Sequence, residues 1–487
     1  MPLNRIAMAR LTGIFRLQLV WSIIFSHGSS YLFSLGSTKS QSSLIWAIGP
    51  ICGAVVQPII GVVADDSRSS WGRRRPFIVG GAIGTVISLL ALAWVSNFMR
   101  ALARAFGVGS DEGVKTMIHL GTVIFITFLN LSIQPLQLGL RTLIVDVCPP
   151  EQQSIASAWA GRFTSIGNIL GYIVGSLQLG FIPYDDEAWR FRFLSLFCVV
   201  VLLTTVSITA YFIREESPSE VTQEPKTGIL PLRVLRNLKN GWAVMPSQSR
   251  RVCLVQFFAW MGWFGFLFYS TSYVGRLYFA ESLRRGVENF DFLRDTGIRL
   301  GTFASLLSAL IALATIVIAP IITSSDSTVV LFENTLTMGQ VRWWRQIHII
   351  WTLSHLLYAF CTFCTLFVSS TKIEMFLIAL TGVSWGVTQW APFAILGKNI
   401  ATWQAERDLA FERGEQLSTS NQSGAIIGAH NAAISVPQIL AALGSSVIFS
   451  ILDGRGASRS DDIAWVLRAS GLAALVAAYF AWRLEER

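Results

Sequence analysis

The sequence predicts an all-α membrane protein with about twelve membrane-spanning helices in two six-helix bundles. Of the 487 residues, 52% are hydrophobic and only 14% are charged, whereas about a quarter of the residues in a soluble protein are charged. Uncharged apolar runs of about 20 residues recur along the chain, and a helix needs that length to cross a hydrocarbon core roughly 30 Å thick. A large soluble enzyme is excluded because so few charges could not cover its surface.

The spans are separated by connections that contain the polar residues. Those at 77–97, 193–213 and 302–322 contain no charged residue. The twelve expected spans are Ile14–Gly36, Leu44–Ala64, Phe77–Asn97, Ile118–Val147, Ala156–Phe181, Phe193–Ile213, Val252–Phe279, Thr302–Ile322, Gln346–Ser369, Ile373–Leu396, Gly424–Leu452 and Ile463–Trp482.

The longest polar stretch between the early and late spans covers residues 214–251 and follows six spans. We interpret it as a cytosolic linker. The chain would then divide into an N-terminal six-helix bundle (1–213), the linker (214–251) and a C-terminal six-helix bundle (252–487). Two related bundles are typical of secondary transporters.

The net charge of +9 does not indicate nucleic acid binding, because Lys and Arg lie between apolar runs rather than on one basic face. In a membrane protein they set orientation, and a cytosolic N-terminus places about 21 basic residues inside and about 14 outside. Both termini are therefore expected in the cytosol. Most of the six cysteines lie within apolar runs, so neither a disulfide framework nor a metal site is expected. No cofactor or enzyme activity is expected either, because no nucleophile–base pair occurs at useful spacing.

The loop between the second and third spans has a pattern suited to a gate. Its residues are Gly61, Asp65, Gly72, Arg73, Arg74 and Arg75. Glycine lets helices approach, the aspartate accepts hydrogen bonds from a neighbouring helix end, and arginines bind helix C-termini or acidic partners. Such a cluster can latch two bundles in one state and release them in another. The alternative is a plain positive-inside anchor.

The fourth span carries a polar stripe. Asn130, Gln134, Gln137 and Arg141 are spaced i, i+4, i+7 and i+11, which places them on one helix face. An arginine within a span faces a water-filled cavity or a partner, and its planar fork of donors suits vicinal hydroxyls. The stripe therefore favours a neutral polyhydroxylated ligand such as a sugar. The alternative is a structural ion pair between Arg141 and Asp146.

Other spans supply further polar and aromatic groups that could complete a sugar site. Each alone is typical of a helix–helix hydrogen bond, but amides, arginines and aromatic faces together suit a sugar ring. The additional candidate residues are Gln18, Trp21, Asn168, Arg276, Gln389 and Asn431.

Several segments resemble the sucrose/proton symporters, which form the glycoside–pentoside–hexuronide group of the major facilitator superfamily. The strongest is Gly72-Arg-Arg-Arg-Pro-Phe-Ile78, and it is joined by Gln57-Pro58-Ile59 and Arg141–Asp146. The segments Gln256–Gly275 and His430–Gln438 are closer to the fungal general α-glucoside permease branch. The resemblance covers nearly all of the chain. It implies the major facilitator fold, alternating access to a central site, and sucrose, maltose or another α-glucoside as substrate.

Carried over by position, the resemblance implies that Arg141 holds sugar hydroxyls. It also places Asn130 where the family has an aspartate that takes the coupling proton. An asparagine cannot ionise, so proton symport, which the family implies, would need another group. The candidates are His27 and His430, because an unperturbed histidine titrates near pH 6.5, at about neutral pH.

We therefore expect a monomeric disaccharide transporter in the lipid bilayer, with a sugar and protons as its ligands and no nucleic acid partner. The plasma membrane is favoured over the vacuole. The alternatives are a facilitative sugar carrier, a non-transporting sugar sensor, and an exporter of another organic solute. A hydrophobic solute would leave the amides of the fourth span without partners.

Overall fold

The described part of the protein is built from helices alone. The computed structural model describes residues 18–65, 67, 69–147, 153–176, 187–212, 236, 239, 242–243, 245–287, 289–329, 346–413, 423–453 and 461–484, and no strand occurs within these ranges. Most of the predicted linker, together with the side chains of Asp65 and Asp146, lies outside this description.

The helices follow the predicted order of spans. Residues 18–23 are helical and run into the π-helix η1 (Ile24–Gly28) and α2 (Ser29–Ser34). The remaining helices of the first half are α3 (Lys39–Asp65), α4 (Arg75–Ala93), α5 (Val95–Ala105), α6 (Asp111–Val147), α7 (Gln153–Ser176) and α8 (Glu187–Phe212). Those of the second half are α10 (Ser247–Arg284), α11 (Phe290–Val329), α12 (Ile347–Phe363), η4 (Cys364–Leu366), α13 (Thr371–Glu412), α14 (Ser423–Asp453) and α15 (Asp461–Trp482).

Every predicted span overlaps a helix, and the prediction of an all-α membrane protein is confirmed. Nine of the helices in the described ranges are long and apolar enough to cross a membrane. The first span, α7 and α13 are not among the nine. The first span is divided by the π-helix, whereas α7 and α13 include charged, amide and hydroxyl side chains that lower their mean hydropathy.

Helix ends differ from the predicted span ends for a physical reason. Hydropathy marks where a helix lies in lipid, but the backbone hydrogen bonds of a helix continue into water. Thus α11 has 40 residues and α13 has 42. The predicted span Phe77–Asn97 ends early instead, because the helix breaks at Trp94 and the amphipathic α5 begins at Val95. In α5 the residues Val95, Met99 and Ala103 are buried.

The chain forms two compact units. The first unit comprises Met1–Val147, Ile173–Met245 and Glu406–Ser446, and the second comprises Cys148–Tyr172, Pro246–Ala405 and Val447–Arg487. Most of α7 therefore groups with the second unit, and most of α14 groups with the first. The division of the chain into bundles at residues 213 and 252 stays a prediction.

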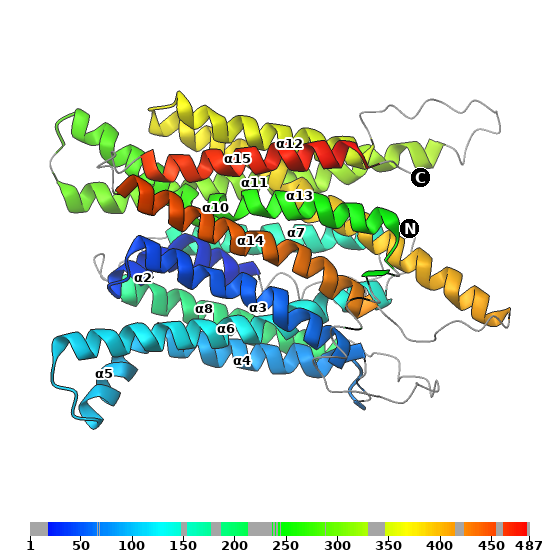
Figure 1. The fold of residues 1–487 in the computed structure, drawn as a ribbon, viewed down its shortest axis with the longest axis horizontal. Coiled ribbons are helices and arrows are strands. Elements are labelled where there is room, and N and C mark those ends of the chain that lie inside the picture. The colour runs from blue at the N-terminus through cyan, green and yellow to red at the C-terminus, as the bar shows by residue number, and fades with distance from the viewer. Residues whose placement is uncertain are drawn as a thin grey trace. The chain divides into compact units, whose positions relative to one another are not determined.

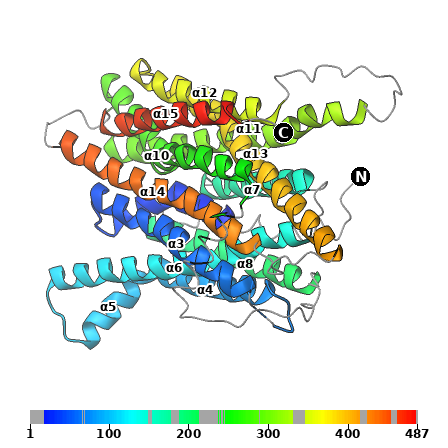
Figure 2. The same cartoon turned by 45° about the vertical axis from the view of Figure 1, so that its right-hand side comes forward.

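The first unit is held together by close helix packing. Helices α4 and α6 lie side by side in both views (Figure 1, Figure 2). Gly81 allows this approach, because a β-carbon there would lie only 2.8 Å from the backbone O of Ser132 and from the backbone N of Leu136. The Tyr31 ring stacks on Phe191 at 4.1 Å, and its hydroxyl donates to the carbonyl of Leu92 at 2.9 Å. This tyrosine joins the first span to α4 and α8.

The second unit has an aromatic core between α10, α12 and α13. Trp263 lies 4.4 Å from Tyr358 and 4.8 Å from Trp385, measured between ring centroids. The Tyr358 hydroxyl donates to the carbonyl of Gly262 at 3.1 Å. Helix α15 packs along α10 and α12, as Figure 1 shows for α12 and α15. These contacts hold α10, α12 and α13 together.

Candidate functional site

The polar stripe of α6 is present as predicted and faces α3. The Gln57 amide of α3 donates to Gln134 Oε1 at 2.8 Å and to Gln137 Oε1 at 3.2 Å. The Gln134 amide in turn donates to the carbonyl of Asn130 at 3.0 Å, and the Asn130 amide donates to the carbonyl of Ile126 at 2.9 Å. A ladder of carboxamides therefore lines this part of the first unit.

Arg141 follows Gln137 by one helical turn on α6 and is hydrogen-bonded to α14. Its Nη1 donates to Asn431 Oδ1 at 3.2 Å. The Asn431 amide donates to the carbonyl of Gly53 at 3.1 Å and to Ser435 Oγ at 3.2 Å. Two of the predicted site residues, 290 positions apart in the sequence, thus meet directly, and Gly53 of α3 completes the junction. We call the group Gln57, Gln134, Gln137, Arg141 and Asn431 the amide–arginine cluster.

The amide–arginine cluster keeps hydrogen-bonding capacity that the described residues do not use. Gln57 is fully buried, and its Oε1 has no hydrogen-bond partner in the described part of the chain. Gln137 is half-buried, and among the described residues only its Oε1 is hydrogen-bonded. An acceptor on Gln57 and a donor on Gln137 therefore have no hydrogen bond among the described residues, and Arg141 stands one helical turn beyond Gln137. Because an unmade hydrogen bond to a buried polar group costs about 1–3 kcal/mol, such groups are suited to a hydroxyl-bearing ligand or to water.

The first span approaches Asn130, the first residue of the α6 stripe, across Gly49 of α3. A β-carbon on Gly49 of α3 would lie 2.8 Å from Asn130 Oδ1 and 3.7 Å from the Trp21 ring. Gln18 and Trp21 are half-buried, and His27 is buried in the π-helix η1. A π-helical turn within an α-helix often marks a functional position. Trp21 and Asn130 are therefore brought together around Gly49.

His430 lies next to Asn431 on α14 and is fully buried. It interacts electrostatically with Arg141. Its place beside the amide–arginine cluster agrees with a role in the site, but a proton on its ring would add a second positive charge beside the guanidinium.

The other predicted site residues belong to the second unit. Arg276 Nη1 lies 2.7 Å from Asp462 Oδ1 of α15, and this carboxylate is buried. Asn168 is buried in α7, and Gln389 is half-buried in α13. These two helices lie close together, because a β-carbon on Gly161 would be 3.7 Å from the Gln389 carbonyl oxygen. Their assignment to sugar binding stays a prediction, as does that of Arg276.

The predicted gate loop shows why glycine stands at its centre. Gly72 has φ +101°, in the left-handed region that favours glycine. The residues before it form a turn in which the Gly72 N–H donates to the carbonyl of Ser69 at 2.9 Å. Arg74 is buried at the N-terminus of α4, and Arg73 and Arg75 are half-buried. Gly61 is buried in α3. The gating role of this loop stays a prediction.

Two buried glutamines were missed by sequence reasoning. Gln57 links the stripe to α3; the segment Gln57-Pro58-Ile59 contributes to the family resemblance, but Gln57 was not proposed as a site residue. Gln256 of α10 is fully buried, and neither of its amide atoms has a hydrogen-bond partner among the described residues. Neither glutamine belongs to a periodic polar pattern within its own span.

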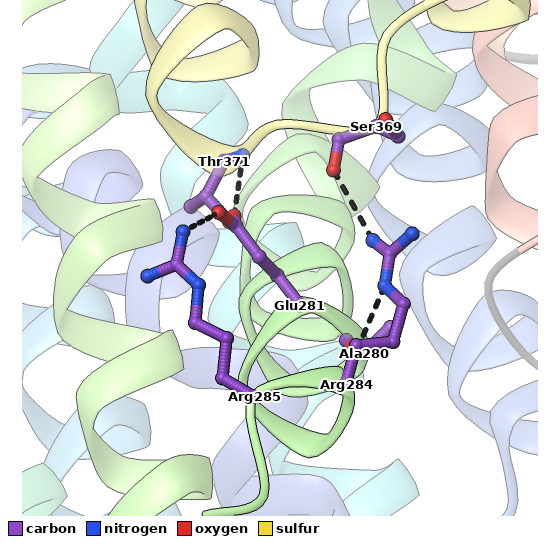
Figure 3. A network of polar contacts seen from close by, with 6 residues as sticks. All are labelled: Ala280, Glu281, Arg284, Arg285, Ser369 and Thr371. Carbon is purple, nitrogen blue, oxygen red and sulfur yellow. Dashed lines mark hydrogen bonds and ion pairs between the residues drawn. The ribbon is translucent and has the colours of Figure 1, made fainter.

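A second polar group lies where α10 ends and α13 begins, within the second unit (Figure 3). Glu281 Oε2 accepts hydrogen bonds from the Thr371 N–H at 2.9 Å and from its hydroxyl at 2.6 Å. Arg285 pairs with Glu281 at 2.5 Å, and Arg284 donates to the carbonyl of Ser369 at 3.4 Å. We call Glu281, Arg284, Arg285, Ser369 and Thr371 the α10–α13 corner.

The long apolar helices, with buried polar groups between them, are those of a multi-pass integral membrane protein. The Major Facilitator Superfamily model matches residues 11–442, and the chain belongs to this superfamily. Its members are membrane transporters, which agrees with the expectation that the protein is not an enzyme.

Relatives and solved structures agree with this membership. The chain is 29% identical to the general alpha-glucoside permease of Schizosaccharomyces pombe, covering 97% of this chain and 92% of the relative. It is 25% identical to sucrose transport protein SUT2 of Oryza sativa, with 88% and 83% coverage.

Two solved transporters share the fold. A bacterial homologue of the iron transporter ferroportin in an outward-facing state superimposes with a TM-score of 0.63 at 12% identity, covering 99% of each chain. The xylose transporter XylE from E. coli gives a TM-score of 0.58 at 12% identity, with 98% and 97% coverage. The predicted family and fold are thereby confirmed.

Proposed function

We propose that the protein transports a disaccharide, namely sucrose, maltose or another α-glucoside, across a membrane by alternating access. The observation that carries the proposal is the amide–arginine cluster, in which Gln57 and Gln137 keep an acceptor and a donor that no described residue uses, one helical turn before Arg141 on α6. A sugar hydroxyl is both donor and acceptor, so adjacent hydroxyls can satisfy these groups at once. The names of the permease and sucrose transport relatives support the same substrate class.

In this proposal each member of the cluster has a separate task. Arg141 offers charged donors to the sugar, and Asn431 holds the guanidinium in place. Gln57 orients Gln134 and Gln137 by donating to both. Trp21 supplies an aromatic face for the apolar side of a sugar ring. The loop 65–75 would act as the cytosolic gate, with both termini in the cytosol and the protein in the plasma membrane.

The source of energy has two candidates. Proton symport is what the family resemblance implies, whereas facilitated diffusion is favoured by one observation: Asn130 cannot ionise, and its amide donates to its own helix at Ile126. His27 and His430 are the histidines proposed to take a proton in the symport case. A non-transporting sensor would bind sugar without moving it.

The test uses purified protein in liposomes and radiolabelled sucrose and maltose. Arg141→Lys keeps the charge but removes the planar fork, and charged hydrogen bonds contribute about 1.5–3 kcal/mol each. We therefore expect counterflow of sugar to fall at least about tenfold. The matched control is Arg468→Lys in α15, where a half-buried arginine donates to the Thr365 carbonyl at 3.0 Å; it should retain counterflow.

The outcomes of these assays decide between the candidates. Equal counterflow by wild type and Arg141→Lys would refute the assignment of the site. Binding of sugar by wild type without counterflow would identify a sensor, and absence of both would favour an exporter of another solute. Sugar accumulation driven by an imposed pH gradient would identify symport, whereas equilibration alone would identify a facilitative carrier.

A further inference from the structure

Two carboxylates are buried in the described part of the chain, Glu374 and Asp462, with 2% and 3% exposure. They differ in their partners. Asp462 is paired with Arg276 and also accepts from the Ile463 N–H at 2.8 Å. Glu374 forms no ion pair within the described residues, and its Oε2 has no hydrogen-bond partner there. Of these two described buried acids, Glu374 is therefore the one without an ion-pair partner among the described residues.

The groups around Glu374 are neutral or engaged elsewhere. Glu374 stands in the first turn of α13. The thiols of Cys361 on α12 and Cys364 on η4 interact with it electrostatically. These thiols are acids themselves, so they bring no positive charge to the carboxylate.

The charged side chains of the neighbouring helices have partners of their own. In the α10–α13 corner Arg285 is bound to Glu281, and Arg284 is bound to the carbonyl of Ser369 (Figure 3). Arg468 of α15 is bound to Thr365, and Lys372 of α13 is exposed. None of the ion pairs among the described residues involves Glu374.

An uncompensated carboxylate is costly in these surroundings. Burying an isolated ionised carboxylate costs several kcal/mol more than burying the neutral acid. The N-terminal dipole of α13 favours the anion by only about 0.3–1 kcal/mol. The packed arrangement of α10, α12 and α13 therefore favours a protonated Glu374, and loss of the proton favours an arrangement in which the carboxylate reaches water.

The position of Glu374 also gives the proton a short route. It lies one helical turn from the end of α13, where Ser369 and Lys372 are exposed. The capping of Thr371 by Glu281 fixes that end of the helix without covering Glu374 Oε2 by a hydrogen bond. Water at the membrane surface is thus separated from the carboxyl group by about 5 Å of helix.

We propose that Glu374 is the proton-binding group that couples sugar movement to a proton gradient, in place of the aspartate that Asn130 replaces. The inference rests on the proposed sugar transport. A proton from water adds to a carboxylate oxygen of Glu374, which removes a buried charge, and returns to water after the change of state. A proton on His430 would instead place a second positive charge near Arg141. The carboxyl group is the better acceptor on these grounds.

The experiment compares wild type, Glu374→Gln and Glu281→Gln in liposomes. Glutamine copies the neutral acid, so Glu374→Gln should retain sugar counterflow but lose accumulation under a pH gradient and lose sugar-induced proton uptake. For one proton per sugar, a gradient of one pH unit supports about tenfold accumulation by wild type, and we expect this to fall to equilibration. The control Glu281→Gln alters the carboxylate of the α10–α13 corner, which is bound to Thr371 at the start of the same helix, and should keep accumulation, with lower thermal stability.

Gradient-driven accumulation by Glu374→Gln at the wild-type level would overturn the proposal. Equilibration of sugar by the wild type without any response to the pH gradient would also overturn the proposal, but the proposed function of sugar transport would be retained. Infrared spectroscopy gives a second readout that does not require transport: wild type should show the carbonyl band of a protonated carboxylic acid, and Glu374→Gln should lack it. A wild type without this band also overturns the proposal, whereas the band without sugar transport would refute only the proposed function.

Discussion

Gly53→Ala tests whether the geometry of the amide–arginine cluster matters, without replacing any of its polar side chains. A β-carbon at position 53 would lie 2.5 Å from Ser435 Oγ and 3.3 Å from Asn431 Nδ2. The first distance is about 1 Å short of ordinary van der Waals contact, so Ser435 and Asn431 must shift together. Asn431 holds Arg141 through a 3.2 Å hydrogen bond.

The expected loss follows from those contacts. Weakening one neutral hydrogen bond and one that involves a charged group costs about 2 kcal/mol, which corresponds to about 30-fold weaker sugar binding. Alanine should not impair folding, because it has a higher helix propensity than glycine by about 1 kcal/mol. The mutant should therefore reach the membrane at wild-type levels.

The assay is equilibrium binding of radiolabelled maltose or sucrose to purified protein, together with thermal unfolding in detergent. The matched control is Gly80→Ala in α4, where an added β-carbon meets nothing within 4 Å. The control should bind sugar as wild type does. If Gly53→Ala also binds within twofold of wild type, Asn431 does not position Arg141 for the sugar and the reasoning fails.

Two further predictions concern the second unit. Asp462→Ala should lower the free energy of unfolding by about 3–5 kcal/mol, because it removes the carboxylate that pairs with the partly buried Arg276. The double mutant Arg276→Met with Asp462→Leu should recover most of the lost stability. Thermal unfolding in detergent measures both variants, and an unaffected single mutant would show that the pair is not structural. Gln256→Met should leave the unfolding temperature unchanged or raise it, because it removes a buried amide that has no hydrogen-bond partner among the described residues. A clear decrease in the unfolding temperature would show that the amide has a stabilising partner such as bound water.

Hydropathy alone was sufficient for the fold class, because the bilayer requires a long apolar run for each span. The same signal could not locate α5, whose residues alternate between buried Val95, Met99 and Ala103 and exposed polar groups. It also could not give helix ends, because a helix such as α13 continues for many residues after its apolar run ends.

Sequence analysis could predict the part of the candidate site whose residues lie on a single helix, α6. The spacing of the α6 residues showed that Gln134, Gln137 and Arg141 share a face, and the structure places Gln57 against that face. Which residue of another helix would stand opposite depends on tertiary packing. No local pattern around Asn431 could show that its amide bridges Arg141 and Gly53, and a lone glutamate in the first turn of α13 looks like an ordinary N-terminal charge.

Pro135 allows α6 to bend within its polar stripe. Proline lacks the N–H that would bond to the carbonyl of Leu131, so α6 can bend at this position at low cost. Asn130 precedes Pro135, and Arg141 follows Pro135 by six residues, which is about 9 Å along the helix axis at 1.5 Å per residue. A bend of about 10° would move Arg141 by about 1.6 Å relative to Asn130, which is enough to break its contact with Asn431. A small hinge motion within one helix could therefore open the cluster without any change in side-chain rotamer.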